Sequence, residues 1–315
     1  MKQVLLLFGA TAVGKSAALA DLARLLPARG GAMEVISADS RQVYRGMDIG
    51  TAKPDRHERA LCPHHLIDIL DPRDPFDVGS FVLACDRLVR EIRERSAIPV
   101  VSGGTAFYLK GFLCGLPGTP RASLEVRALL EERLKQEGLG VLRRELEQLD
   151  PASAARIGEN DQYRILRGLE VYHVTGKPRS SFTDPREPRP GLNAVVLGLQ
   201  RDRKELYGRI DARVAAMFDA GLPREVEALY EAGYRPGDPG LRTIGYREFF
   251  ELGGPPPWSR SDLSRIQTLI AGNTRRYARR QELFFRKLPQ VRWVEADDRE
   301  ALLRVADGVM QVFSK

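Results

Sequence analysis

The N-terminal stretch constrains the fold of this chain more than any other segment. Val4–Phe8 is an unbroken apolar run of the length expected for a buried strand. It leads directly into Gly9-Ala10-Thr11-Ala12-Val13-Gly14-Lys15-Ser16, and a helical pattern follows with leucines at three- and four-residue steps. A strand, the spacing G-x-x-x-x-G-K-S and a helix are together the full context of a phosphate-binding P-loop.

The residue types of this loop suit an anion. Glycines let the backbone N–H groups point inward, and the N-terminus of the following helix adds positive potential. We expect Lys15 to reach a terminal phosphate and the Ser16 hydroxyl to ligate Mg²⁺. The alternative is a glycine-rich turn that binds nothing, and the motif alone does not say which phosphate is bound.

The remaining apolar runs predict an α/β fold. Strands are expected at 33–37, 65–69, 98–102, 193–199 and 291–294, separated by helical patterns. This alternation predicts a P-loop NTPase-like core with a parallel sheet flanked by helices. Residues 121–190 lack a good strand pattern, so we expect a mainly helical insertion there. The core domain is then 1–120 together with 191–315.

In a parallel sheet, ligands bind beyond the carboxyl ends of the strands. This rule places Gly9–Ser16, Asp39 and Gly103–Thr105 around one crevice. Asp39 could hold Mg²⁺ through water or accept a proton from a bound nucleophile. Asp39 and Thr105 could equally serve only as caps of the helices that follow them.

Basic residues point to a polyanionic partner. The net charge is +7, and Arg275, Arg276, Arg279 and Arg280 form adjacent rows on a predicted helix. Such a face suits a nucleic-acid backbone, although a solvated helix face is the alternative. In the segment 162–167, Tyr163 could stack on a base. That segment could also be an amphipathic helix with Ile165 and Leu166 buried.

Several motifs, in order, resemble those of the tRNA dimethylallyltransferases. They are the P-loop, Asp39–Tyr44, Met47–Pro54, His64–Ile69, Gly103–Thr105, Asn160-Asp161 with Arg164 and Arg167, Ile244–Tyr246 and Thr274–Gln281. The chain departs from the family pattern at Ala10, at Ala106-Phe107, at Tyr163 and at Phe284, where a tryptophan is more familiar.

The resemblance implies a Mg²⁺-dependent transfer of a dimethylallyl group from dimethylallyl diphosphate to N6 of adenosine 37 in the tRNA anticodon loop. Lys15 would neutralise the departing diphosphate, Ser16 would ligate the metal, and Arg213 would add a diphosphate contact. Asp39 would be the general base, and Thr105 would position the reacting groups. With the arginine face, the expected tRNA contacts are Asp39, Ser40, Arg41, Gln42, Thr105, Arg127, Gln162, Tyr163, Arg164, Ile165, Leu166, Arg167, Arg275, Arg276, Arg279 and Arg280.

Two other functions share these features. One is a P-loop kinase acting on a small metabolite, with the insertion as its lid, and the other is a non-catalytic, nucleotide-gated RNA-binding protein. No apolar run reaches the length of a membrane span. We therefore expect a cytoplasmic protein, and we expect it to be a monomer.

Overall fold

The computed structural model describes residues 2–120, 123–298, 300–302, 304–305 and 307–308. The chain divides into two compact units, one of Met1–Leu113 with Glu187–Lys315 and one of Cys114–Arg186. We call them the core unit and the helical unit. The segment predicted as an insertion, 121–190, begins and ends slightly later than the helical unit. The predicted boundary at 121 and the predicted end of the core at 315 lie outside the described residues.

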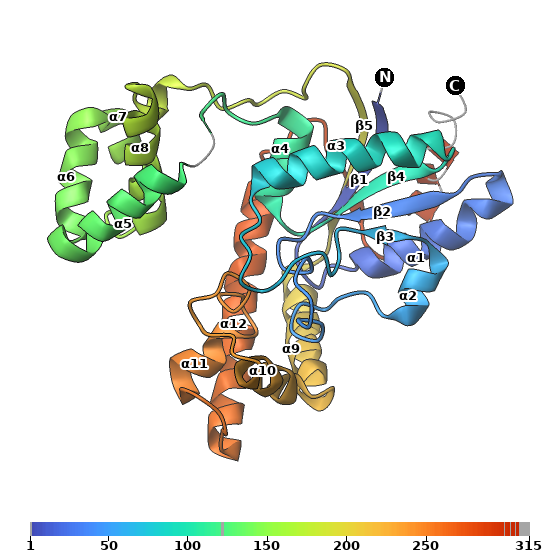
Figure 1. Cartoon of the computed structure of the whole chain (residues 1–315). Helices are drawn as coiled ribbons and strands as arrows, with labels where there is room; N and C mark the ends of the chain where they lie inside the picture. Colours follow the sequence, from blue (N-terminus) through green and yellow to red (C-terminus); the bar gives the residue numbers. More distant parts are fainter. Residues whose placement is uncertain (1, 121–122, 299, 303, 306, 309–315) are drawn as a thin grey trace. The chain divides into compact units, whose positions relative to one another are not determined.

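The core unit is built on a parallel sheet, as the alternating pattern predicts (Figure 1). Its strands are β1 (Lys2–Phe8), β2 (Met33–Ser37), β3 (His64–His65), β4 (Ile98–Gly103), β5 (Leu192–Gln200) and β6 (Arg292–Glu295). They are arranged in the order β3-β2-β4-β1-β5-β6. Strand β1 therefore pairs with β4 and β5, and the P-loop emerges from the middle of the sheet.

The strand predicted at 65–69 is wrong beyond its first residue. Leu66 and Asp68 have φ of 61° and 59°, in the left-handed region that cannot continue a strand. The Asp68 carboxylate forms ion pairs with the Lys53 ammonium at 2.5 Å and with the Arg59 guanidinium at 3.0 Å. These ion pairs hold the chain in a turn where its apolar pattern favours a strand.

Helices cover both faces of the sheet. Those of the core unit are α1 (Lys15–Leu25), α2 (Arg56–Leu61), α3 (Val78–Glu94), α4 (Ala106–Cys114), α9 (Arg203–Asp219), α10 (Leu222–Glu231), α11 (Arg247–Gly253) and α12 (Arg260–Phe285). Helix α1 packs in one cluster with Leu5 and Leu7 of β1, while α3 runs along β1, β2 and β4. These two helices lie on opposite sides of the sheet in Figure 1.

The helical unit has its own small core. It contains α5 (Leu124–Glu137), α6 (Leu139–Leu149), α7 (Pro151–Ala154) and α8 (Gln162–Thr175). Gly138 separates α5 from α6 with φ 79°, a value that glycine adopts without strain. Leu130, Leu142, Leu146 and Leu169 pack between the helices. Across the described part of the whole chain, we find no helix both long and apolar enough to span a bilayer.

Candidate active site

The P-loop wraps tightly between β1 and α1. Ala12 and Gly14 have φ of 64° and 123°, so the backbone bends through conformations that residues other than glycine rarely adopt. Gly9 has no room for a side chain, because a Cβ there would lie 2.7 Å from the Leu199 carbonyl oxygen on β5. Such strain is typical of sites where backbone groups are aimed at a ligand.

Lys15 bends back over this loop. Its ammonium donates hydrogen bonds to the carbonyl oxygens of Gly9 and Ala10, each at 2.9 Å. Burial and, second to it, the positive charge of Arg213 lower the pKa of Lys15 to about 8, while the negative charge of Asp39 acts in the opposite direction. The lysine therefore lies in a positive, poorly solvated setting that favours an anionic partner.

Three arginines that follow β5 in the sequence donate hydrogen bonds to the P-loop. Arg201 and Arg209 donate from Nε to the carbonyl oxygens of Val13 and Ala12, each at 3.0 Å. Arg213 Nη1 donates to Thr11 Oγ1 at 3.4 Å, and burial, then Arg209, lowers the pKa of Arg213. Only Arg213 was predicted. The four-residue spacing of Arg209 and Arg213, which puts both on one face of α9, is the sequence signal for Arg209.

The loops that carry Asp39 and Thr105 are joined to each other. The Ser40 amide donates to Thr105 Oγ1 at 2.9 Å, and the Thr105 amide donates to the Ala38 carbonyl at 3.1 Å. The Arg41 amide donates to Asp39 Oδ1 at 2.9 Å, which orients the half-buried carboxylate. The predicted convergence of the two strand ends is thus present as direct hydrogen bonds.

The negative charge of Asp39 contributes to the raised pKa of two tyrosines. Burial raises the pKa of Tyr277 to about 12, and the negative charge of Asp39 is the next cause. Burial likewise raises the pKa of Tyr108, with a smaller contribution from Asp39. Both phenols therefore stay neutral at physiological pH, and the Asp39 carboxylate lies within electrostatic reach of Tyr108, Tyr277 and Lys15.

Gln281 of α12 connects the P-loop to the Gly104 turn. The Thr11 amide donates to Gln281 Oε1 at 2.9 Å, and Gln281 Nε2 donates to the Gly104 carbonyl at 2.6 Å. The side chain is only 3% exposed. A Cβ at Gly104 would lie 2.6 Å from that nitrogen, so the glycine makes room for this bond. The sequence showed Gln281 only as the end of a basic helix, with no signal for its partners.

Replacing Gln281 with methionine is expected to lower the affinity for inorganic pyrophosphate by about tenfold, because a buried amide left unpaired costs about 1–3 kcal/mol. Gln281→Glu keeps an acceptor for Thr11 but places a carboxylate against the Gly104 carbonyl and beside the anion site, so it should lose at least as much affinity. Isothermal titration with pyrophosphate measures both, and Gln267→Met on the same helix is the control. Equal affinities for all four proteins would contradict this role.

The lowered pKa of Lys15 predicts a pH-dependent affinity for the diphosphate. Below pH about 8 the free protein already carries the ammonium, whereas above it a proton must be taken up on binding. The dissociation constant should therefore rise with pH above this value, by at most about tenfold per pH unit. Titration calorimetry across this range tests it. Lys15→Arg keeps its charge throughout and should show a flatter profile, which also corrects for titration of the ligand.

The loop after Asp39 is ordered by its own contacts. Ser37 Oγ donates to Gln42 Oε1 at 3.0 Å, and Gln42 Nε2 donates to the carbonyl of Ala52 at 3.1 Å. Arg41 Nη1 donates to the Pro239 carbonyl at 3.1 Å. The amide of Gln42 is therefore engaged within the protein, although the sequence predicted a tRNA contact there.

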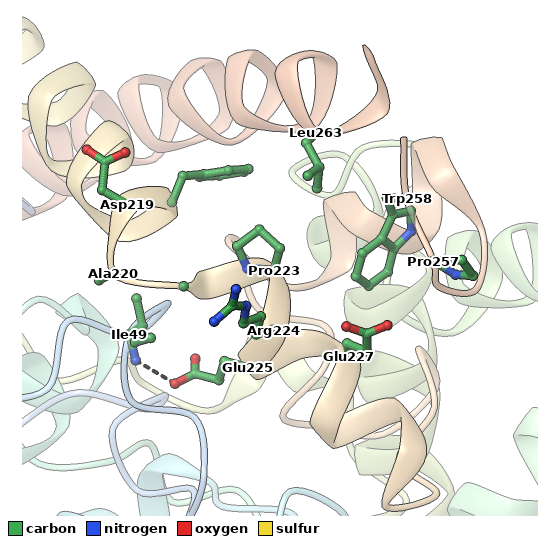
Figure 2. Close-up of a pocket in the computed structure, with 12 residues that line it drawn as sticks. Ile49, Asp219, Ala220, Pro223, Arg224, Glu225, Glu227, Pro257, Trp258 and Leu263 are labelled. Atoms are coloured by element: carbon green, nitrogen blue, oxygen red, sulfur yellow. Dashed lines mark hydrogen bonds between the residues drawn. The ribbon is translucent and has the colours of Figure 1, made fainter. Parts of the chain in front are cut away.

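A hollow of about 760 Å³ lies elsewhere in the core unit, where α9 meets α10 (Figure 2). Trp258 and Pro223 line it together with acidic and basic side chains, and none of the predicted site residues does. Glu225 on its wall accepts the amides of Asp48 and Ile49 at 3.0 and 2.8 Å. The hollow thus borders a residue that anchors the 48–50 turn, and we assign it no part in the chemistry.

The arginines of α12 differ in whether their guanidinium groups already have partners within the protein. Arg275 pairs with Asp211, and Arg276 donates to the Asn273 side chain. Arg279 and Arg280 are exposed, and neither is found in an ion pair within the described part of the chain. These two are therefore the cations of the face most open to an external phosphate.

In the helical unit, the segment 162–167, which was predicted to contact tRNA, has an exposed side and a buried side. Gln162, Tyr163 and Arg164 are exposed at the start of α8. Ile165 and Leu166 are fully buried in the small core, so their prediction as tRNA contacts is wrong and the amphipathic alternative is correct. The helical period turns these two side chains inward, away from the exposed face.

Arg127 and Arg167 share a buried acid. They lie 3.6 and 3.1 Å from the carboxylate of Glu170, which is fully buried. The Arg127 guanidinium also lies 5.3 Å from the ring centroid of Tyr163, which is 67% exposed. Both arginines thus stabilise the helical unit by pairing with Glu170. Arg127 also lies against the exposed ring of Tyr163.

Comparison with known proteins identifies the family of this chain. The model of the family described as IPP transferase matches residues 42–288. A tRNA dimethylallyltransferase of Geobacter sulfurreducens is 43% identical over 93% of this chain and 92% of its own length. The solved tRNA isopentenylpyrophosphate transferase of Bacillus halodurans is 34% identical, with a TM-score of 0.70, covering 100% of this chain and 98% of that one.

A solved eukaryotic dimethylallyltransferase, described as acting on tRNA, is 27% identical with a TM-score of 0.77, and the match covers 95% of this chain and 75% of that chain. The family match spans more than half of the sequence, and the Geobacter relative is similar over nearly its whole length. This chain therefore belongs to the IPP transferase family.

Proposed function

We propose that this protein transfers a dimethylallyl group from dimethylallyl diphosphate to N6 of adenosine 37 in the anticodon loop of tRNA, releasing diphosphate. The observation that carries the proposal is the convergence of Gly9–Ser16, Asp39 and Thr105 at one edge of the sheet. The same helix that contacts the P-loop through Gln281 also exposes Arg279 and Arg280. The names of the similar proteins support this reaction.

The reaction forms a bond between N6 of adenine and C1 of the dimethylallyl group, and it breaks the bond between C1 and the diphosphate oxygen. N6 must also lose a proton, and an exocyclic amine is a poor nucleophile. The Asp39 carboxylate, oriented by the Arg41 amide, accepts that proton. Thr105 Oγ1, fixed by the Ser40 amide, positions the amine or the diphosphate.

The leaving group gains negative charge as the bond breaks. Lys15, Arg213 and the N–H groups at the start of α1 stabilise this charge. The exposed Ser16 hydroxyl is suited to a Mg²⁺ ion shared with the diphosphate, because Mg²⁺ usually keeps few protein ligands beside phosphates and water. The described chain contains no group of three or more His, Cys, Asp or Glu side chains that would form a separate cage. When bound, Mg²⁺ would neutralise charge on the diphosphate.

The adenine must leave its stack before N6 can reach Asp39. We propose that Arg279 and Arg280 contact the RNA backbone, and that exposed Gln162, Tyr163 and Arg164 of the helical unit contact it as well. Binding should weaken steeply with salt, because each phosphate contact releases counterions. We further propose that the protein acts as a monomer in the cytoplasm.

One assay tests the function. The protein is incubated with labelled dimethylallyl diphosphate, Mg²⁺ and unmodified tRNA, and the digested nucleosides are examined for labelled adenosine. Label on N6 of the adenosine next to the anticodon is the expected result. Unmodified tRNA together with phosphate transfer from ATP would favour a kinase, and tRNA binding without any covalent change would favour a non-catalytic RNA-binding protein.

A further inference from the structure

Two exposed apolar side chains, Phe107 and Leu283, and the half-buried Phe284 form a surface that the mechanism above does not use. We call it the aromatic patch. Phe107 is 58% exposed and Leu283 is 56% exposed. The rings of Phe107 and Phe284 lie 5.6 Å apart, inclined by 44°, and so connect the start of α4 to α12. No other phenylalanine in the described part of the chain is as exposed as Phe107.

The aromatic patch lies next to the reacting groups. Phe107 follows Thr105 by two residues, so their Cα atoms are at most about 7 Å apart. On α12, Phe284 is three residues after Gln281, which places both on one helix face. Gln281 contacts Gly104 directly. Phe107 and Phe284 therefore border the turn that carries Thr105, on the side where α12 passes.

Cations flank the aromatic patch along α12. Arg279 and Arg280 lie four residues before Leu283 and Phe284, and Arg286 and Lys287 lie three residues after them. All four are exposed, whereas the nearby acid, Glu282, is half-buried. Exposed aromatic rings between exposed cations are the combination used to bind single-stranded nucleic acid, with bases stacking on the rings and phosphates meeting the cations.

We propose that the aromatic patch is a stacking platform for an unpaired nucleobase of the tRNA loop, one adjacent to the reacting adenine. This inference rests on the proposed function and adds to it a binding site for a second base. A second copy of this chain is a poorer occupant, because a two-fold interface would place the same four cations opposite their own copies.

Binding of the RNA loop should depend on stacking against the flat face of the Phe107 ring, and not only on the apolar area of that side chain. The probe is an RNA hairpin with the anticodon-loop sequence, carrying 2-aminopurine in turn on each side of the target adenine. Phe107→Ala should weaken its binding by about tenfold or more and remove the fluorescence quenching at one of the two positions. Phe107→Trp should keep both signals, and Phe107→Leu should lose the quenching although it keeps the packing against Phe284.

Leu83→Ala is the matched control, since Leu83 is 56% exposed, close to the 58% of Phe107, and belongs to α3 rather than to α4 or α12. Affinity for inorganic pyrophosphate, and the melting temperature, should be the same in all variants. Hairpin binding and quenching by Phe107→Ala equal to those of the wild type would overturn the platform. So would a wild-type dimer that Phe107→Ala converts to a monomer with unchanged RNA affinity.

Failure of the platform and failure of the proposed function give different results. If the wild type transfers no prenyl group to tRNA, the proposed function fails whatever Phe107 does. If the wild type modifies tRNA and Phe107→Ala retains full hairpin affinity and quenching, only the platform fails.

Discussion

Asp39→Asn is expected to lower the rate of prenyl transfer by about 10²- to 10⁴-fold, the range typical of losing a general base. The asparagine oxygen can still accept the Arg41 amide, so the loop should keep its conformation. The amide cannot accept a proton from N6 of adenine. The affinity for tRNA should stay nearly unchanged, because the proposed contacts to the RNA backbone lie on α12 and α8. Single-turnover transfer and filter binding measure the two effects separately.

The control for this substitution is Asp77→Asn. Asp77 caps α3 by accepting the Ser80 amide at 2.7 Å, and asparagine serves equally well at such a position. It removes the same charge without touching the site and should leave transfer intact. Full turnover by Asp39→Asn would refute Asp39 as the base, and a parallel loss of tRNA affinity would point to a binding role instead.

Gly103→Ala is expected to damage both stability and catalysis. A Cβ at Gly103 would lie within 2.8 Å of the Ala38 Cα and closer still to the Ala38 carbonyl oxygen. These are backbone atoms that cannot rotate away. Overpacking of this kind costs about 1–3 kcal/mol or more, which should lower the melting temperature by about 2–5 °C in a chain of this size. Since Asp39 follows Ala38, its displacement should also slow transfer by about 10²-fold.

Gly208→Ala provides the comparison. Gly208 lies within α9, and a Cβ there meets nothing within 4 Å. Alanine at this position should raise stability by about 0.5–1 kcal/mol, since glycine weakens helix interiors. Calorimetry with single-turnover transfer on both variants checks the pair. Equal melting temperatures for Gly103→Ala and the wild type would mean that the two loops are less tightly joined than their hydrogen bonds indicate.

The parts of this site that could be predicted from sequence depend on local rules. The P-loop is one contiguous motif, and Asp39 and Thr105 each follow a strand, so the topology of a parallel sheet brings them together. The basic helix was predicted from its own spacing, and it does expose Arg279 and Arg280.

The missed contacts depend on tertiary packing. Arg209 reaches Ala12 across 197 positions and Gln281 reaches Thr11 across 270, and no local pattern encodes either distance. The prediction for Ile165 and Leu166 was wrong for another reason. The residues 162–167 are contiguous in the sequence, but the helical period separates their buried and exposed side chains.

The contact between Gln281 and Thr11 has a consequence for how the protein is made. The side chain that accepts the Thr11 amide belongs to residue 281, which a ribosome adds 270 positions after Thr11. The growing chain therefore lacks this contact with the P-loop until α12 has been synthesised. A nascent chain stalled before residue 281 should be retained by a pyrophosphate column more weakly than the chain with α12 in place.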